Sequence, residues 1–231
     1  MVQEMTPITV RVKFCKTGNL QYISHLDLVR TMNKVVTRTA LPLWYTEGFN
    51  PKPKMVFAAT LSIGTESVVE FMDLRLTERA DPTEIMDALN RNLTEEMQVS
   101  EVYYPQTRLT DLKWLRYDIT IDTEGADAEL AAKCELLLSN DSVITEKKGK
   151  NGELRSVDIR PLIHTVKATA EKGTLHIFCI LSGDASAFLN PELVVRYLKK
   201  EAGILSDPCL VKEGYRILRA GAYREDMTPF R

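Results

Sequence analysis

Hydrophobic and polar residues alternate along residues 8–14, ITVRVKF, so that every second side chain is apolar. A period of two is typical of a strand with one buried face. Residues 16–19, KTGN, are of the kinds that turns favour. The chain therefore opens with a predicted strand and a turn.

The apolar positions that follow have a helical period. On a helical wheel one face carries Leu28, Val29, Met32, Val35, Val36 and Ala40, and the opposite face carries Asp27, Arg30, Lys34 and Arg38. Ser24 and Asp27 have the spacing of a capping box, in which the serine oxygen accepts from a free helix amide and the carboxylate accepts from the N–H of the cap residue. We expect a helix that begins at His25 and ends before Pro42, because a proline displaces the preceding residue from the helical region.

Two prolines shape the segment after this helix. Residues 47–54, EGFNPKPK, contain Pro51 and Pro53, which exclude a helix and weaken strand pairing. We therefore expect a shaped loop that presents Lys52 and Lys54. The aromatic residues near these lysines in the sequence are Trp44, Tyr45 and Phe49.

The rest of the first half completes a recognisable order of elements. Residues 55–63 and 68–76 predict two strands, Asp81 and Pro82 mark the start of a helix, and residues 99–104 predict a closing strand. The order strand, helix, strand, strand, helix, strand is that of the split βαβ, or ferredoxin-like, unit, with two helices on one face of an antiparallel sheet. A polar, turn-rich stretch at residues 105–111 predicts a domain boundary.

The second half predicts a similar order with one added hairpin. We expect a strand at 115–121, a helix at 126–138, hairpins at 143–159 and 164–181, a helix from about 190 to 200 and a strand at 210–218. The polar tail, residues 220–226, is expected to be loosely held. The predicted fold class is α+β, with two ferredoxin-like units in tandem over residues 1–106 and 112–231.

Composition is that of an ordinary globular protein: of 231 residues, 44% are hydrophobic and 27% are charged. No signal peptide and no long apolar run is present, so we expect a cytoplasmic protein without a membrane anchor. The four cysteines are widely spaced and predict neither a metal site nor a disulfide framework; we expect them to be reduced, partly buried and not involved in cofactor binding: Cys15, Cys134, Cys179 and Cys209.

Charge is unevenly distributed along the first half. Residues 8–57 contain eight Lys or Arg and two acids, whereas residues 66–101 contain ten acids and three Arg. A basic segment beside the free amides at the start of a helix suits an anionic ligand such as phosphate or nucleic acid.

The string KTGNLQYISHLDLVRTMNKVVTRTALPLWYTEGFNPKPKMVFAATLSIGTES resembles the N-terminal signature of the radical-SAM-linked family of bacterial proteins. The segment RSVDIRPL, residues 155–162, is also similar to a segment of that family. The resemblance implies a partner of a radical-SAM enzyme, since this chain lacks the C-x-x-x-C-x-x-C cluster of the enzyme itself. The frequent position of such genes near those for ribosomal proteins and ribonucleases implies a connection with RNA.

These observations predict a ligand-binding set without an assigned catalytic residue: Ser24, His25, Arg30, Lys34, Arg38, Asn50, Lys52 and Lys54. Three functions stay open. The first is a non-catalytic partner that binds RNA or another phosphate-bearing ligand, with the aromatic residues stacking on bases. The second is a metal-independent endoribonuclease with His25 as general base, Tyr22 as a possible acid and a lysine that stabilises charge at the phosphate.

The third function is a protein-interaction scaffold without nucleic acid. His25 is either packed in the first turn or lines a pocket at the helix N-terminus, where the dipole would lower its pKa. Asp158 and Arg160 form either a structural pair or part of a binding site. The oligomeric state stays open.

Overall fold

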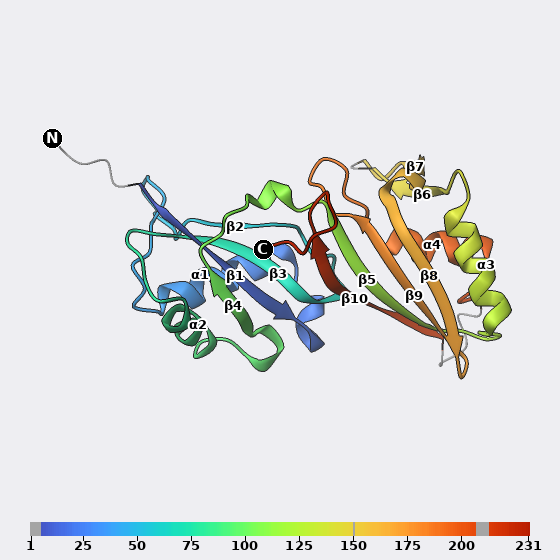
Figure 1. Cartoon of the computed structure of the whole chain (residues 1–231), viewed down its shortest axis with the longest axis horizontal. Coiled ribbons are helices and arrows are strands. Elements are labelled where there is room, and N and C mark those ends of the chain that lie inside the picture. Colours follow the sequence, from blue (N-terminus) through green and yellow to red (C-terminus); the bar gives the residue numbers. More distant parts are fainter. Residues whose placement is uncertain (1–5, 150, 207–212) are drawn as a thin grey trace. The chain divides into compact units, whose positions relative to one another are not determined.

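The protein folds into two compact units, one built from Met1–Leu112 with Phe230–Arg231 and one built from Lys113–Pro229. The computed structural model describes residues 6–149, 151–206 and 213–231 (Figure 1). The division after Leu112 lies next to the turn-rich stretch 105–111. The expected second domain extended to residue 231, whereas Phe230 and Arg231 belong to the first unit.

The first unit has the element order strand, helix, strand, strand, helix, strand. Its elements are β1 (Ile8–Lys16), α1 (His25–Thr37), β2 (Met55–Phe57), β3 (Thr65–Leu76), α2 (Pro82–Asn90) and β4 (Val99–Tyr103). The strands lie in the order β4-β1-β3-β2, and each neighbouring pair is antiparallel. Leu74 of β3, for example, is opposite Val10 of β1 and Met55 of β2.

The core of the first unit confirms the two periods in the sequence. Val10, Val12 and Phe14 of β1 are fully buried, as the alternation predicts. The buried side chains of α1 are Leu28, Met32, Val35 and Val36, and those of α2 are Ile85 and Leu89. Burying a side chain of this size contributes about 1.5–3 kcal/mol, so these two helices are held chiefly by their apolar faces.

An ion pair lies inside this unit. The guanidinium of Arg11, which is 0% exposed, donates to both carboxylate oxygens of Asp73 at 2.7 and 3.1 Å. It also donates to the hydroxyl and carbonyl oxygens of Thr107 at 2.9 and 3.0 Å, and it lies 4.7 Å from the ring centroid of Phe230. Lys16 is 1% exposed, so two of the eight basic residues counted in residues 8–57 are inside the protein.

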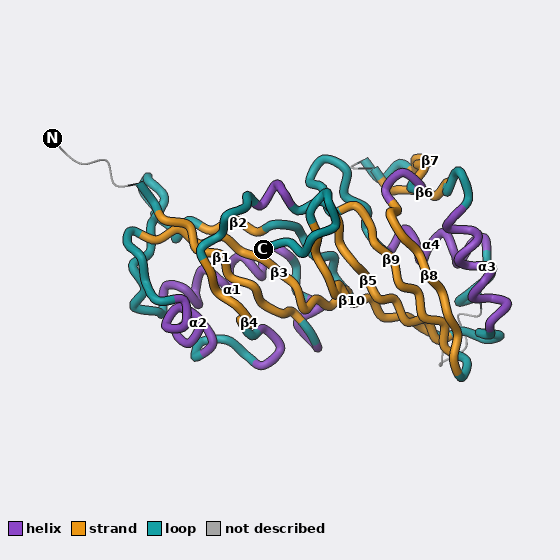
Figure 2. The backbone as a smooth tube through the Cα atoms, in the orientation of Figure 1, coloured by secondary structure: helices purple, strands orange, loops and turns teal. Residues whose placement is uncertain are grey.

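The second unit has a comparable order with an inserted hairpin. Its elements are β5 (Trp114–Asp122), α3 (Ala128–Ser139), β6 (Ile144–Lys148), β7 (Leu154–Asp158), β8 (Ile163–Glu171), β9 (Thr174–Ser182), α4 (Glu192–Glu201) and β10 (Gly214–Tyr223). The main strands lie in the order β10-β5-β9-β8, with antiparallel neighbours, and β6 pairs with β7 in a separate two-stranded sheet. The protein is thus an α+β protein with mainly antiparallel sheets (Figure 2).

Two expectations about element limits were wrong. The strand expected at 55–63 ends at Phe57, because the chain bends at residues 58–59. It then turns at residues 63–64, where the Gly64 N–H donates to the carbonyl of Gln21 in the first 3-10 helix, Gly18–Tyr22. The limits of α1 agree with the prediction, because the helix begins at His25 and ends at Thr37, before Pro42; Arg38 and Thr39 donate to the carbonyls of Val35 and Val36.

The second concerns the tail, which was expected to be loose from residue 220. Residues 220–223 are the last part of β10, and Gly221 and Ala222 are buried. The Tyr223 carbonyl accepts the Lys113 N–H at 2.9 Å, which holds this end of the strand. Of the strand expected at 210–218, residues 210–212 lie outside the described residues.

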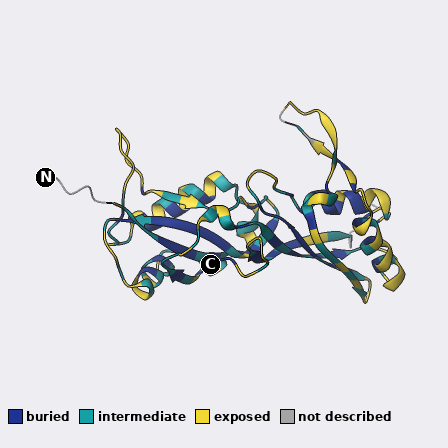
Figure 3. Cartoon of the chain, turned by 45° about the horizontal axis from the view of Figure 1, so that its top comes forward, coloured by how far each residue is buried: buried dark blue, intermediate teal, exposed yellow. Residues whose placement is uncertain are grey.

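Buried residues concentrate on the strands, and the helices carry exposed outer faces (Figure 3). In the part of the chain that the structure describes, no helix has the length and apolar character needed to cross a membrane. Cys15 is half-buried, and Cys134 and Cys179 are buried free thiols; Cys209 lies outside the described residues.

Candidate functional site

The loop between α1 and β2 is a paired ribbon tied to β3. The Thr46 N–H donates to the Lys52 carbonyl at 2.8 Å, and the Lys54 N–H donates to the Trp44 carbonyl at 2.9 Å. Arg75 of β3 accepts from the Trp44 N–H at 2.9 Å and donates to the Lys54 carbonyl at 3.0 Å. The prolines therefore do not leave a free loop, because backbone hydrogen bonds fix both of its arms.

The tip of this loop projects into solvent. Residues 47–50 are exposed, and Phe49 among them is fully exposed. Gly48 has φ +118, a backbone conformation that favours glycine.

A cavity of about 300 Å³ lies between α1 and the loop, entirely within the first unit. It is lined by Arg30, Asn33, Lys34, Thr37, Tyr45, Pro51, Lys52 and Pro53. The four helix residues have the spacing i, i+3, i+4 and i+7, which places them on one stripe of α1. The two basic segments that the sequence separates by about twenty positions thus meet at one cavity.

Three cations surround this cavity. The guanidinium of Arg30 lies 3.3 Å from the carboxylate of Asp27, but both side chains are more than half exposed, at 66% and 53%. Among the described residues, Lys34 and Lys52 have no carboxylate oxygen within 4 Å. Convergent charges of one sign with so little compensation favour an anion between them.

The start of α1 is satisfied by its own side chains. Ser24 Oγ accepts the Asp27 N–H at 3.2 Å, as the capping box predicts. The carboxylate of Asp27 accepts from the Ser24 hydroxyl at 2.6 Å, and this hydrogen bond is the main reason why the pKa of Asp27 is lowered. A carboxylate therefore occupies the place where the helix amides were expected to attract phosphate.

His25 packs against the interior. Its ring makes an edge contact with the ring of Phe57, with centroids 5.4 Å apart. Its Nδ1 is buried and has no hydrogen-bond partner among the residues that the structure describes. Neither Ser24 nor His25 is among the described residues that line the cavity, and no contact orients this imidazole towards the lysines.

The other members of the predicted set lie outside the lining of the cavity. Arg38 is the C-cap of α1, and Asn50 and Lys54 are exposed loop residues. Of the aromatic residues near the lysines, Tyr45 lines the cavity and is 43% exposed. The sequence prediction missed Asn33 and Thr37, although their spacing from Arg30 on the helix was a usable signal.

Asp158 and Arg160 do not form a pair through their side chains. The Asp158 carboxylate accepts the N–H groups of Arg160 and Val143 at 3.0 and 2.9 Å and the hydroxyl of Ser142 at 3.1 Å. The guanidinium of Arg160 donates to the Ile163 carbonyl at 2.8 Å. Both side chains hold the backbone around the end of β7, which is a structural role.

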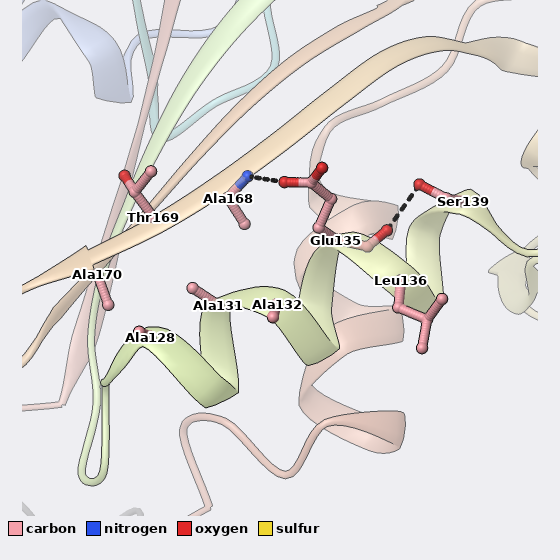
Figure 4. Close-up of a pocket in the computed structure, with 9 residues that line it drawn as sticks. All are labelled: Ala128, Ala131, Ala132, Glu135, Leu136, Ser139, Ala168, Thr169 and Ala170. Carbon is pink, nitrogen blue, oxygen red and sulfur yellow. Dashed lines mark hydrogen bonds between the residues drawn. The ribbon is translucent and has the colours of Figure 1, made fainter.

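A larger hollow, of about 620 Å³, lies between α3 and β8 in the second unit (Figure 4). It is lined mainly by small residues such as Ala128, Ala131 and Ala132. Its one carboxylate, that of Glu135, already accepts the Ala168 N–H at 2.9 Å. Nothing in this lining selects a ligand, so the cavity beside α1 is the stronger candidate.

Comparison with known proteins gives a family and a distant structural similarity. The fold is similar to that of a chain in the crystal structure of a Cbf5-Nop10-Gar1 complex, with a TM-score of 0.48 and 10% identity. The similarity covers 94% of this chain and 50% of the other, so this chain spans half the length of that relative. Comparison with curated protein sequences gives no match.

A family model matches residues 9–191, and its description is "Uncharacterized protein conserved in bacteria (DUF2344)". This description does not mention radical-SAM enzymes, so that association stays a prediction. Because the match covers well over half of the sequence, the chain belongs to this conserved bacterial family.

Proposed function

We propose that the cavity between α1 and the loop binds a phosphate group of RNA or of another phosphate-bearing ligand, and that the protein is a non-catalytic binding partner. The observation that carries the proposal is the convergence of Arg30, Lys34 and Lys52 on one cavity of about 300 Å³. Two of these three cations have no nearby carboxylate among the described residues.

Binding would rest on charge-assisted hydrogen bonds. The guanidinium of Arg30 and the ammonium groups of Lys34 and Lys52 donate to phosphate oxygens, which only accept. Arg30 can leave Asp27 at little cost, because an exposed ion pair contributes about 0–1 kcal/mol. Tyr45, in the wall of the same cavity, offers a ring on which a base can stack.

The test is the salt dependence of RNA binding. We expect a fluorescein-labelled single-stranded RNA octamer to bind with an anisotropy change that weakens as KCl increases. Each phosphate contact with a single strand contributes about −0.7 to the slope of log K against log salt, so three contacts contribute about −2. Between 50 and 200 mM salt such a slope lowers affinity about 20-fold.

The variant R30A/K34A/K52A should bind weakly and lose about 2 from the magnitude of the slope. The matched control is R155A/K172A/K200A, which also removes one Arg and two Lys charges, but from exposed positions of the second unit. If the cavity variant binds like wild type with the same slope, or if the control loses as much affinity as the cavity variant, the proposal is wrong.

A radical-SAM enzyme is the proposed protein partner, and residues 13–66 carry the resemblance that supports it. We expect the enzyme to co-purify with the tagged protein from a cell that encodes both, in the cytoplasm. Ribonuclease treatment separates the two alternatives: loss of the enzyme indicates that RNA bridges the pair, whereas retention indicates a direct protein contact.

We also infer that both units are ferredoxin-like. What supports this is the common strand order: β4-β1-β3-β2 in the first unit and β10-β5-β9-β8 in the second, each with antiparallel neighbours. The β6–β7 hairpin is then an insertion between the first helix and the second main strand of the repeat.

A further inference from the structure

The sheet of the second unit has one buried face and one accessible face. Along β5, residues Leu115, Tyr117, Ile119 and Ile121 are buried, and the residues between them are only partly buried. The same alternation runs along β9 from Leu175 to Cys179. The accessible face therefore consists of alternate residues of the main strands, opposite the core.

Two rows of three side chains cross this face. The register places Asp118 of β5 and Lys167 of β8 on either side of Phe178 of β9. The next row on the same face places Thr120 and Thr169 on either side of His176. All six residues, together with Ile119 and Ile177, line a cavity of about 270 Å³.

Phe178 is the centre of this arrangement. It lies on β9, an inner strand of the four, and its side chain is only partly buried. The guanidinium carbon of Arg116 lies 5.5 Å from its ring centroid, and Arg116 is itself held by the carboxylate of Asp118 at 3.1 Å. The Phe178 ring thus lies on the accessible face, and neither of its neighbours in the row, Asp118 and Lys167, is apolar.

Most polar neighbours of the ring are available to a ligand, whereas one carboxylate oxygen of Asp118 already accepts from Arg116. The side chain of Lys167 is 71% exposed, and its one ion pair among the described residues is with the Glu135 carboxylate, at 3.5 Å. His176 is exposed, and the two threonines beside it each carry a hydroxyl that can donate or accept. An aromatic ring, an imidazole, two hydroxyls, a carboxylate and an ammonium group therefore surround one small hollow.

We propose that this face binds an unpaired base of single-stranded RNA, as a second site on the other unit from the phosphate-binding cavity. The base stacks on Phe178 and His176, the Asp118 carboxylate and the threonine hydroxyls hydrogen-bond its edge, and Lys167 contacts the flanking phosphate. Single-stranded RNA is commonly bound in this manner, by aromatic side chains on a four-stranded antiparallel sheet.

The composition of the face favours RNA over a protein partner. The centre of a protein interface is depleted of charged residues and rich in contiguous apolar surface. Here the one aromatic ring lies between a carboxylate and a lysine, and the next row is entirely polar. A flat base with polar edges and an adjacent phosphate matches these neighbours better than an apolar protein surface does.

The test compares an RNA with bases and a backbone without them. Wild type and two variants, F178L and F178Y, are titrated with a fluorescein-labelled A8 RNA and with an abasic octamer of the same backbone. Leucine keeps the apolar volume but removes the flat ring, whereas tyrosine keeps the ring. Far-UV circular dichroism and thermal unfolding establish that each variant is folded; H176A is the substitute if F178L does not fold.

We expect F178L to bind A8 about 5- to 150-fold more weakly than wild type, the range that corresponds to the loss of one stacked base. F178Y should bind A8 like wild type, and neither variant should change binding of the abasic octamer. Equal affinity of F178L and wild type for A8, or an equal loss with the abasic octamer, would overturn the proposal and leave the face to a protein partner.

This outcome is separable from that of the proposed function. Stacking releases no counterions, so F178L should leave the slope of log K against log salt unchanged, whereas R30A/K34A/K52A should change it. A variant at either site that fails to weaken binding therefore counts against that site alone.

Discussion

The buried ion pair between Arg11 and Asp73 allows a quantitative test of the first unit. We consider the substitution Asp73→Ala, which removes the carboxylate and leaves the guanidinium inside the protein. Arg11 is 0% exposed and would keep two hydrogen bonds, both to Thr107, and the contact with the Phe230 ring. It would lose the only carboxylate with which it makes a salt bridge among the described residues.

The expected loss follows from these contacts. Removing one partner of a buried pair costs about 3–5 kcal/mol, because an uncompensated charge remains in a medium of low polarity. The contacts with Thr107 and Phe230 keep the cost near the lower limit, so we expect Asp73→Ala to reduce the free energy of unfolding of the first unit by about 3 kcal/mol. With a urea m-value of about 2 kcal/mol/M, the unfolding midpoint should decrease by about 1.5 M.

The assay uses the two tryptophans of the chain, Trp44 in the first unit and Trp114 in the second. Replacing Trp114 with Phe leaves Trp44 as the only tryptophan, so its fluorescence reports urea unfolding of the first unit. The control is R11M/D73L, which removes both charges at similar volume. It should recover most of the stability, since replacing a buried pair by apolar residues is often neutral.

A cost below about 1 kcal/mol for Asp73→Ala would refute this reasoning, because it would mean that water reaches the guanidinium. A double variant no more stable than Asp73→Ala would also refute it, because the loss would then arise from packing rather than from an unpaired charge.

Two further predictions concern titratable groups. The N–H groups of Arg160 and Val143 hold the pKa of Asp158 below its usual value of 3.8. The contribution of Asp158 to stability is therefore present above pH 4 and is lost as the pH falls through the lower, folded-state pKa. Asp158→Asn should lower stability at pH 7 and reduce the steepness of acid unfolding followed by circular dichroism; an unchanged acid transition would contradict this. Burial raises the pKa of the Cys134 thiol to about 11 and raises that of Cys179 further. Iodoacetamide at pH 8 should therefore label both thiols only after urea is added, as measured by mass spectrometry of peptides. Rapid labelling of either thiol in the native protein would contradict this, because it would show that the thiol is accessible.

Most of the elements could be predicted from the sequence because their signals are local. Period-two alternation identified β1, and side-chain caps identified the starts of α1 and α2 at Ser24 and Asp81. Where a limit depended on distant partners, the prediction was wrong. The end of β10 resembles a tail in composition, although it pairs with β5. Gly221 suits this position because an added Cβ would lie only 3.1 Å from the Cβ of Arg116, its partner on β5.

The candidate site could be predicted only in part for the same reason. The basic residues of α1 and of the loop were visible as charges, but the sequence does not say which of them point to one cavity. Arg11 and Lys16 also contributed to the basic count, and both are buried. The partner of Arg11 is 62 positions away, so no local pattern indicates its burial.

The position of Phe230 in the first unit has a consequence for synthesis of the chain on the ribosome. Its side chain is 3% exposed and makes an edge contact with Phe71, at 5.0 Å between ring centroids. Residue 230 is translated roughly 120 positions after the other residues of that unit are complete. At about 5–20 residues per second the nascent first unit waits roughly 6–24 s with Phe71 and Arg11 uncovered on that side, an interval in which a chaperone has time to bind.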